Sequence, residues 1–231
     1  MARIDKRALT KLEIVQEASR QFLEKGYSGT TISAISRALD MSPGNLTFHF
    51  PTKEHLLAVL VDLLCDFQWK IMEQEADEGL SSIMALCLEL TSMASACEQD
   101  VVIKDFFLSA YTSPMCLEII RRNDTARSMK VFAAHRPDWT REQFAEAEIL
   151  CSGIEYATLM TAGDPVTLET RVAGALNNIL GIYNIPEDVR KAKIQRVFSL
   201  DYRTLGREIL ARFREYVCHT NEQALHEMLT R

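Results

Sequence analysis

Apolar residues recur at spacings of three and four along most of the chain, a pattern that predicts amphipathic helices. The first stretch has its apolar positions at Leu9, Leu12, Val15, Ala18 and Phe22. This helix is expected to end at Lys25-Gly26, because glycine adopts the left-handed turn after a helix without strain. No alternating run of apolar and polar residues with glycine-rich turns occurs in the sequence. The pattern therefore predicts an all-α fold.

Two short helices follow the first one. One is expected to begin at Thr30 or Thr31, and the other at Ser42-Pro43, where a capping hydroxyl precedes a proline in the first turn. The turn of about four residues between them, 39–42, is the length at which two short helices cross at a wide angle. The pair is therefore predicted to form a helix-turn-helix, whose second helix fits the major groove of DNA.

The rest of the chain predicts a larger helical body. A long helix is expected to begin after Pro51–Glu54, with an apolar stripe from Leu56 to Ile71. Further helices are predicted at Ser81–Cys97, Val101–Thr112, Pro114–Ala134, Thr140–Ala162, Val166–Tyr183, Pro186–Leu200 and Tyr202–Met228. We divide the chain into a DNA-binding domain at residues 1–52 and a helical domain at residues 53–231.

Two of these helical segments have almost no charge. Ile149–Gly163 contains only Glu155, and Val172–Pro186 contains no charged residue. Helices of this kind are covered on all sides, and small residues such as Gly153 and Gly174 let neighbouring helices approach closely. We favour a four-helix interface between two copies of the chain, and the alternative is an ordinary core.

Composition and charge indicate which class of protein the sequence encodes. The 231 residues are 47% hydrophobic and 25% charged, which suits a folded protein with a real core. Residues 1–60 carry 8 basic and 6 acidic side chains, whereas the remainder carries 18 and 26. A slightly basic head on an acidic body suits a protein whose head alone contacts a polyanion.

The chain shows no signal for secretion or membrane insertion. The N-terminus lacks an apolar segment with a cleavage site, and no apolar run reaches the length of a membrane span. The six cysteines form no C-x-x-C pair, so they are interpreted as buried small hydrophobic residues. These features predict a cytoplasmic protein without a membrane partner.

Motifs of catalysis are missing from the sequence. The five histidines show no H-E-x-x-H spacing, and the chain has no G-x-S-x-G, glycine-rich phosphate loop or dinucleotide fingerprint. We therefore expect no catalytic residue, no metal site and no cofactor.

The N-terminal segment resembles a known family. The matching positions are Ile14-Val15, Ala18, Phe22, Gly26-Tyr27, Thr30-Thr31, Ile35-Ser36, Met41-Ser42, Gly44, Leu46, His49-Phe50, Lys53-Glu54 and Leu56-Leu57. Together they look like the DNA-binding domain of the TetR family of bacterial regulators. The resemblance covers about residues 9–57, and the remainder is similar to the family only in length and helical character.

The resemblance implies a set of DNA-binding residues. Thr31, Ser42, His49 and Lys53 match positions that bind phosphates, while Pro43, Gly44, Asn45 and Phe48 match positions that face bases. The implied set comprises Thr31, Ser33, Ser42, Pro43, Gly44, Asn45, Thr47, Phe48, His49 and Lys53.

Among the residues that match base-facing positions, only Asn45 offers the paired donor and acceptor that can bind adenine in a bidentate way. Specificity is then expected to depend on thymine methyl groups and DNA shape.

Simpler roles compete with these assignments. Thr31 and Ser42 are also good helix caps, a role compatible with phosphate contact. Phe48 has the alternative of packing inside the protein.

Two residues depart from the family pattern. Asp40 stands where the turn glycine is usual, which is tolerable because aspartate enters the left-handed region more readily than most residues. Thr47 stands where the third helix usually has tyrosine, and its shorter reach weakens the prediction of a phosphate contact.

For the body, the resemblance implies dimerisation and the binding of an effector. The candidate lining residues are Trp69, Met84, Phe106, Phe107, Tyr111, Met115, Glu155, Tyr156 and Met160. The alternative for the apolar members is plain core. A buried Glu155 needs either a protein partner, such as an arginine, or a cationic ligand.

The sequence as a whole is interpreted as a homodimeric transcriptional regulator, a repressor that binds a near-palindromic operator in double-stranded DNA and is released by a small apolar or amphipathic ligand. One alternative is a regulator of the same fold that is controlled by a protein partner or has no effector. Another is an enzyme or binding module that carries an incidental helix-turn-helix.

Overall fold

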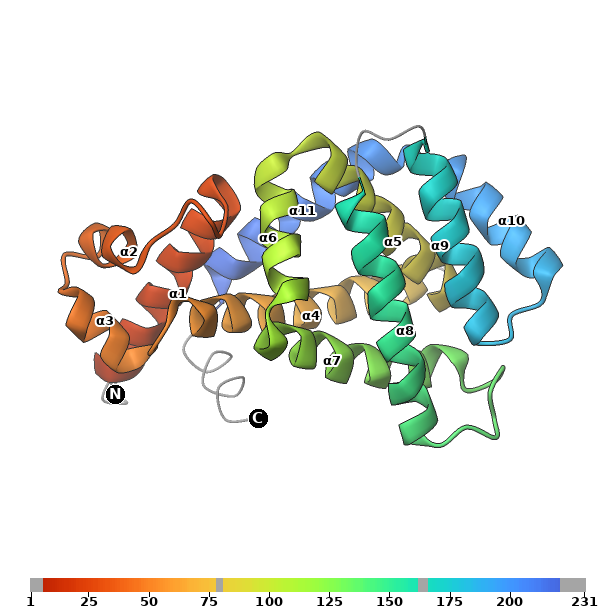
Figure 1. Ribbon diagram of the computed structural model, residues 1–231, viewed down its shortest axis with the longest axis horizontal. Coiled ribbons are helices and arrows are strands. Elements are labelled where there is room, and N and C mark those ends of the chain that lie inside the picture. Colours follow the sequence, from red (N-terminus) through yellow and green to blue (C-terminus); the bar gives the residue numbers. More distant parts are fainter. Residues whose placement is uncertain (1–5, 78–80, 162–165, 221–231) are drawn as a thin grey trace.

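The computed structural model describes residues 6–77, 81–161 and 166–220, and all regular elements within these ranges are helices. Three helices form the head (Figure 1): α1 (Lys6–Lys25), α2 (Ile32–Ala38) and α3 (Pro43–His49). The body comprises α4 (Lys53–Asp77), α5 (Ser82–Gln99), α6 (Val101–Thr112), α7 (Pro114–Phe132), α8 (Arg141–Met160), α9 (Leu168–Ile182), α10 (Glu187–Phe198) and α11 (Tyr202–His219). The all-α prediction is confirmed for the described residues, where each predicted helix is present; Ala162 and the predicted continuation of the last helix from 221 to Met228 lie outside them.

The ends of the head helices follow the predicted capping chemistry. Thr31 Oγ1 accepts a hydrogen bond from the Ala34 amide at 3.1 Å, and Ser42 Oγ accepts one from the Asn45 amide at 3.1 Å. Two turns require the left-handed region. Gly26 closes α1 with φ +83°, and Asp40 lies in the turn between α2 and α3 with φ +51°. Asp40 therefore adopts the conformation for which glycine is usual.

The helix α4 connects the head to the body. It begins directly after α3, packs against α1, and continues along α5 and α7 (Figure 1). At the centre of the body lies α5, in contact with α4, α6, α8, α9, α10 and α11. Its apolar composition suits this position, since most of its sides are covered. The proposed boundary at residue 52 remains a prediction, because α4 packs against both parts.

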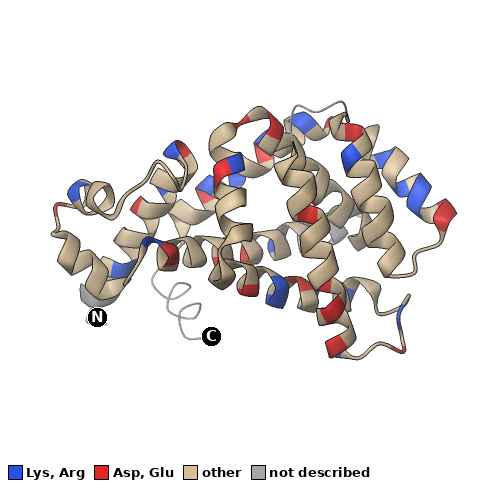
Figure 2. Cartoon of the chain, viewed as in Figure 1, with Lys and Arg blue, Asp and Glu red and all other residues tan. Residues whose placement is uncertain are grey.

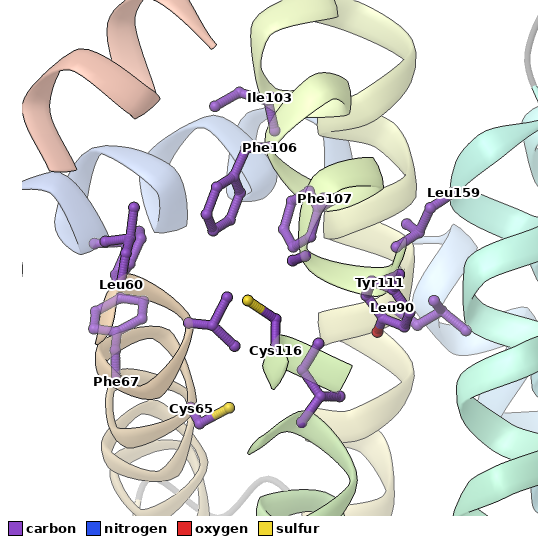
Figure 3. Packing of buried hydrophobic residues seen from close by; sticks show 14 of the residues in the cluster. Leu60, Cys65, Phe67, Leu90, Ile103, Phe106, Phe107, Tyr111, Cys116 and Leu159 are labelled. Carbon is purple, nitrogen blue, oxygen red and sulfur yellow. The ribbon is translucent and has the colours of Figure 1, made fainter. Parts of the chain in front are cut away.

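The interior of the body is filled from several helices at once. Figure 3 shows Leu60 and Phe67 from α4, Phe106 and Phe107 from α6, and Leu159 from α8 converging there. Five of the six cysteines are buried as predicted, but the prediction was wrong for Cys218, which is exposed on the last turn of α11. Among the described residues, no helix has the length and apolar character to span a membrane.

Candidate functional site

The helix α3 presents its first turn and one outer face to solvent. Residues 42–45 are exposed, and the Phe48 side chain is 68% exposed, so it does not pack into the core. On the opposite side, Leu46 and Phe50 are buried and hold the helix against the head. The helix carries no Lys, Arg, Asp or Glu (Figure 2). The four residues predicted to face bases, Pro43, Gly44, Asn45 and Phe48, thus share one accessible, uncharged surface.

The two capping hydroxyls lie at the beginnings of α2 and α3. Both Thr31 and Ser42 are exposed, and each accepts a backbone hydrogen bond. A hydroxyl that accepts in this way keeps its own O–H as a donor, so the same group can cap a helix and donate to a phosphate oxygen. Ser33, in the first turn of α2, is also exposed. All three hydroxyls are therefore accessible from the surface of the head.

Thr47 and Lys53 have partners inside the protein. Thr47 Oγ1 donates to the carbonyl oxygens of Pro43 at 3.1 Å and Gly44 at 3.2 Å. Lys53 Nζ donates to the carbonyl oxygens of Tyr27 at 2.8 Å and Thr30 at 2.9 Å. The same ammonium lies 4.0 Å from the centre of the Tyr27 ring, and burial lowers the pKa of Lys53. Lys53 thus ties α4 to the loop between α1 and α2.

His49 differs from these two residues. Its side chain is half-buried at the end of α3, and its ring lies edge-on to the Phe48 ring, with centroids 5.4 Å apart. The predicted phosphate contact of His49 stays a prediction.

The head is also held to the body through α6. Asp105 accepts hydrogen bonds from the Ser28 amide at 2.8 Å and from the Ser28 hydroxyl. A Cβ atom on Gly26 would lie 2.6 Å from Asp105 Oδ2 and would displace this carboxylate, and the φ of +83° itself favours glycine. A second link joins the body helices α4 and α7, where the Ser113 hydroxyl donates to Glu54. The loop in front of α2 is therefore hydrogen-bonded directly to α6.

An interior cavity of about 70 Å³ lies within the body, lined by residues of α4, α5, α6, α7, α8 and α9. Its wall is mostly apolar, but six charged or amide side chains reach it. These are Gln68, Glu89, Asp124, Arg127, Glu148 and Glu155.

A second cavity of about 80 Å³ adjoins the first and is lined by α4, α5, α6 and α11. Its wall is almost entirely apolar and includes Phe67, Phe106 and Phe213. The two cavities share Leu64, Gln68, Glu89, Met93 and Phe107. Gln68 Nε2 donates to Glu89 Oε1 at 2.7 Å, which places one polar pair at the junction of two apolar spaces.

The carboxyl groups of the first cavity have few charged partners. Arg127 Nη2 donates to Glu89 at 3.0 Å and lies 3.6 Å from Asp124. Glu155 accepts a hydrogen bond from the Tyr111 hydroxyl at 2.8 Å, and Glu148 accepts one from the Tyr183 hydroxyl. One guanidinium therefore faces four carboxyl groups.

Burial and the excess of carboxyl groups raise the pKa values of these side chains. Burial raises the pKa of Asp124 to about 7, with Arg127 opposing the change. Burial also raises the pKa of Glu155 well above its usual value, and the carboxyl groups of Asp124 and Glu148 raise it further. The pKa of Glu148 is raised by burial too, although the Tyr183 hydroxyl stabilises its ionised form.

The predicted lining residues are only partly brought together. Phe106, Phe107, Tyr111 and Glu155 line the two cavities. Five others line neither of them: Trp69, Met84, Met115, Tyr156 and Met160. Their helices place these five side chains away from both cavities. Lys130 lies 5.2 Å over the Trp69 ring, Met84 is buried elsewhere, and Tyr156 points outward. Glu155 has a tyrosine as its partner, so the arginine alternative is wrong for its direct hydrogen bond.

Sequence reasoning missed Asp124, Arg127, Glu148 and Tyr183. One signal was available for Glu148, because it lies seven residues before Glu155 and therefore on the same face of α8. Asp124 and Arg127 lie in a charged stretch of α7 that gives no such signal. Among the residues that the structure describes, no group of three His, Cys, Asp or Glu side chains is placed to hold a metal ion.

The outer faces of α8 and α9 carry no charged side chain near their middles; the exposed residues are apolar on α8, whereas α9 exposes Gly174 together with the amides of Asn177 and Asn178. On α8, Leu150 is 59% exposed, and Gly153 and Ala157 are exposed on the same side. On α9, Gly174 is exposed, and a Cβ atom added there or at Gly153 would meet no atom within 4 Å. A core helix would be covered at these positions, so the ordinary-core alternative does not explain this face.

Comparison with known proteins identifies the head. Residues 14–60 match the sequence model of a family described as bacterial regulatory proteins, tetR family. The biofilm operon icaADBC HTH-type negative transcriptional regulator IcaR of Staphylococcus aureus (strain Newman) is 30% identical over 76 residues, which are 33% of this chain and 41% of IcaR. The HTH-type transcriptional repressor AcnR of Corynebacterium glutamicum is 32% identical over 85 residues, covering 37% and 44%. The match thus spans about two fifths of these curated relatives.

Solved structures with a similar arrangement cover more of the chain. Salmonella enterica GusR is 19% identical, with 79% of this chain and 99% of that chain covered at a TM-score of 0.46. A gamma-butyrolactone receptor (ArpA-like protein) is 20% identical, with 91% and 99% covered at a TM-score of 0.42. Residues 14–60, from within α1 to the first turns of α4, therefore form a helix-turn-helix domain of the kind found in the tetR family of bacterial regulatory proteins.

Proposed function

We propose that this protein is a homodimeric repressor of transcription that binds a near-palindromic operator and is released from it by a small amphipathic effector. The observation that carries the DNA-binding part is the surface of α3. Its base-facing residues are exposed together, while the buried Leu46 fixes the helix from behind. A helix presented in this way enters the major groove with its N-terminal residues toward the bases. A repressor role is favoured because IcaR and AcnR are both described as negative regulators.

The proposed dimer forms through the outer faces of α8 and α9. Leu150, Gly153 and Ala157 present an apolar, uncharged surface, and Gly174 allows close approach of a neighbouring helix. Two copies related by a two-fold axis place their α3 helices toward half-sites about one DNA turn apart, or a multiple of it. Because its partner is the chromosome, the proposal places the protein in the cytoplasm.

The proposed effector occupies the two adjoining cavities. Both are lined by α6, and Asp105 of α6 holds the loop in front of α2. An effector that shifts α6 therefore favours a dimer whose α3 helices no longer match successive major grooves. This is a shift of population between two arrangements of the dimer.

The DNA-binding part is tested by titrating the protein against DNA from upstream of its own gene at several salt concentrations. We expect tight, site-selective binding that weakens steeply with salt. Asn45→Ala and Phe48→Ala should each reduce site-selective affinity about tenfold or more. Val101→Ala is the matched control, since Val101 is an apolar residue 80% exposed on α6. Wild-type affinity in both α3 variants would contradict the assignment of α3 as the reading helix.

The dimer is tested separately by sedimentation equilibrium. Gly153→Arg places a long charged side chain on the proposed interface and should give monomers, whereas the same substitution at exposed Gly44 should leave the dimer intact. A dimer that persists in Gly153→Arg would place the interface elsewhere.

A further inference from the structure

The wall of the first cavity carries more acidic than basic side chains. Four carboxyl groups line it, and the guanidinium of Arg127 is the cation among its lining residues. Arg127 directs Nη2 toward Glu89 and Asp124. Glu155 has only the neutral Tyr111 hydroxyl as its hydrogen-bond partner among the described residues. An ionised carboxyl group in this setting is costly, because a hydroxyl supplies one hydrogen bond and no opposite charge.

Arg127 is itself incompletely paired. The residue is 5% exposed, yet its Nε and Nη1 atoms have no hydrogen-bond partner among the residues that the structure describes. Buried guanidinium N–H groups without acceptors are expensive, and protein interiors avoid them. These two atoms have almost no accessible surface, so they are closed off from the cavity. What the cavity lacks is a cation beside its carboxyl groups.

Asp124 and Glu155 lie close enough to influence each other. Asp124 is the strongest charged influence on the pKa of Glu155, and it raises that pKa, as do Glu148 and Glu89. Asp124 remains 17% accessible because it faces the cavity, although it lies deep in the protein. A cation placed between the two carboxyl groups would favour their ionised forms together.

The adjoining cavity offers an apolar space that suits a hydrocarbon chain. Beyond the Gln68–Glu89 pair, its wall is built mainly from leucine, isoleucine, alanine, methionine and phenylalanine side chains of α4, α5, α6 and α11, with the Ser92 hydroxyl as a further polar group. A chain that passes this pair leaves the charged cavity and enters an apolar one. The two spaces together suit a molecule with a charged head and a hydrocarbon tail.

If the cavities hold the effector, as proposed above, we infer that the effector is an amphipathic amine. Its ammonium lies between Asp124 and Glu155, and its apolar chain extends past Gln68 into the second cavity. An anionic or neutral molecule of the same shape leaves the carboxyl groups without a counter-charge.

The test compares three six-carbon probes that differ in their head group: hexylamine, hexan-1-ol and hexanoate. Their dissociation constants are measured by calorimetry on the full-length protein without DNA. We expect hexylamine to bind about tenfold or more tightly than hexan-1-ol, and hexanoate to bind most weakly. Glu155→Gln, whose amide oxygen still accepts from Tyr111, should reduce the preference for hexylamine severalfold, with Asp124 still present. Glu187→Gln is the control, because it makes the same substitution on the exposed face of α10.

Two outcomes overturn the inference. One is equal binding of hexylamine and hexan-1-ol to the wild-type protein, and the other is an undiminished preference in Glu155→Gln. Both leave DNA binding untouched, because that property is measured separately on the upstream DNA. If hexylamine binds selectively but leaves the affinity for DNA unchanged, the amine site stands and its role as effector site fails. Loss of specific DNA binding by the wild-type protein alone would contradict the proposed function and not the amine site.

Discussion

The surface of α3 and the wall of the first cavity differ in where their functional residues lie in the sequence and in the fold. On α3, the residues proposed to face DNA lie next to one another in the sequence, are exposed, and contribute little to the core. In the cavity, the charged and amide residues come from α4, α5, α7 and α8 and are surrounded by protein. Substitutions on α3 should therefore change binding and leave stability intact, whereas substitutions in the cavity should change both. Binding data on α3 variants can therefore be interpreted alone, whereas cavity variants need stability data as well.

The largest effect is expected from Arg127→Met. This change leaves Glu89 and Asp124 buried without their guanidinium, and removing one partner of a buried ion pair costs about 3 kcal/mol. Urea unfolding measures the loss. The control is Lys191→Met, because Lys191 pairs with Glu187 on the exposed face of α10, where no measurable change is expected. A loss in Arg127→Met no larger than in Lys191→Met would remove the distinction between the cavity and the surface.

The second effect is a dependence of stability on pH. The pKa of Asp124 is about 7 in the folded protein, and its ordinary value is near 4. Between these values the folded chain keeps a proton that the unfolded chain has released, so stability falls as the pH rises through this window. Glu148 and Glu155 act in the same direction because their pKa values are also raised.

We expect the free energy of unfolding to decrease by about 2 kcal/mol between pH 5 and pH 8. Asp124→Asn should flatten this slope in urea unfolding series at each pH. Asp201→Asn, at the exposed cap of α11, should keep the wild-type slope, since asparagine caps helices as well as aspartate does. A slope that is the same in Asp124→Asn and wild type would show that Asp124 titrates normally.

The third effect lies at the contact between the two regions. Asp105→Ala removes the acceptor of the Ser28 amide and hydroxyl, at a cost of about 1 kcal/mol. It should also reduce the response of DNA affinity to hexylamine, measured as the ratio of dissociation constants with and without the amine. Val101→Ala, on the same helix but 80% exposed, should preserve the response. An unchanged ratio in Asp105→Ala would exclude this contact as the route from the body to the head.

The sequence predicted the head far better than the cavity, for a physical reason. The beginnings of α2 and α3 depend on Thr31, Ser42 and Pro43, whose capping and dihedral preferences act within a few residues. The cavity depends on which side chains of distant helices meet. Asp124 and Arg127 read as surface charges until α7 is packed against α4 and α8. The two carbonyl partners of the Lys53 ammonium likewise come from the distant loop between α1 and α2, and the predicted phosphate contact of Lys53 stays a prediction.

The smallest effect is expected at the turn between α2 and α3. Asp40 has φ +51°, a conformation that costs an aspartate more than a glycine, although glycine loses more conformational entropy on folding. Asp40→Gly should therefore stabilise the protein by only about 0.5 kcal/mol, measured as the shift in the urea midpoint at constant slope. Asp40→Ala is the matched variant, since alanine lacks both the polar side chain and the freedom of glycine, and it should destabilise. If glycine destabilised as much as alanine, contacts of the Asp40 side chain would be stabilising the turn. Polar side-chain contacts would then determine stability in the head as they do in the cavity.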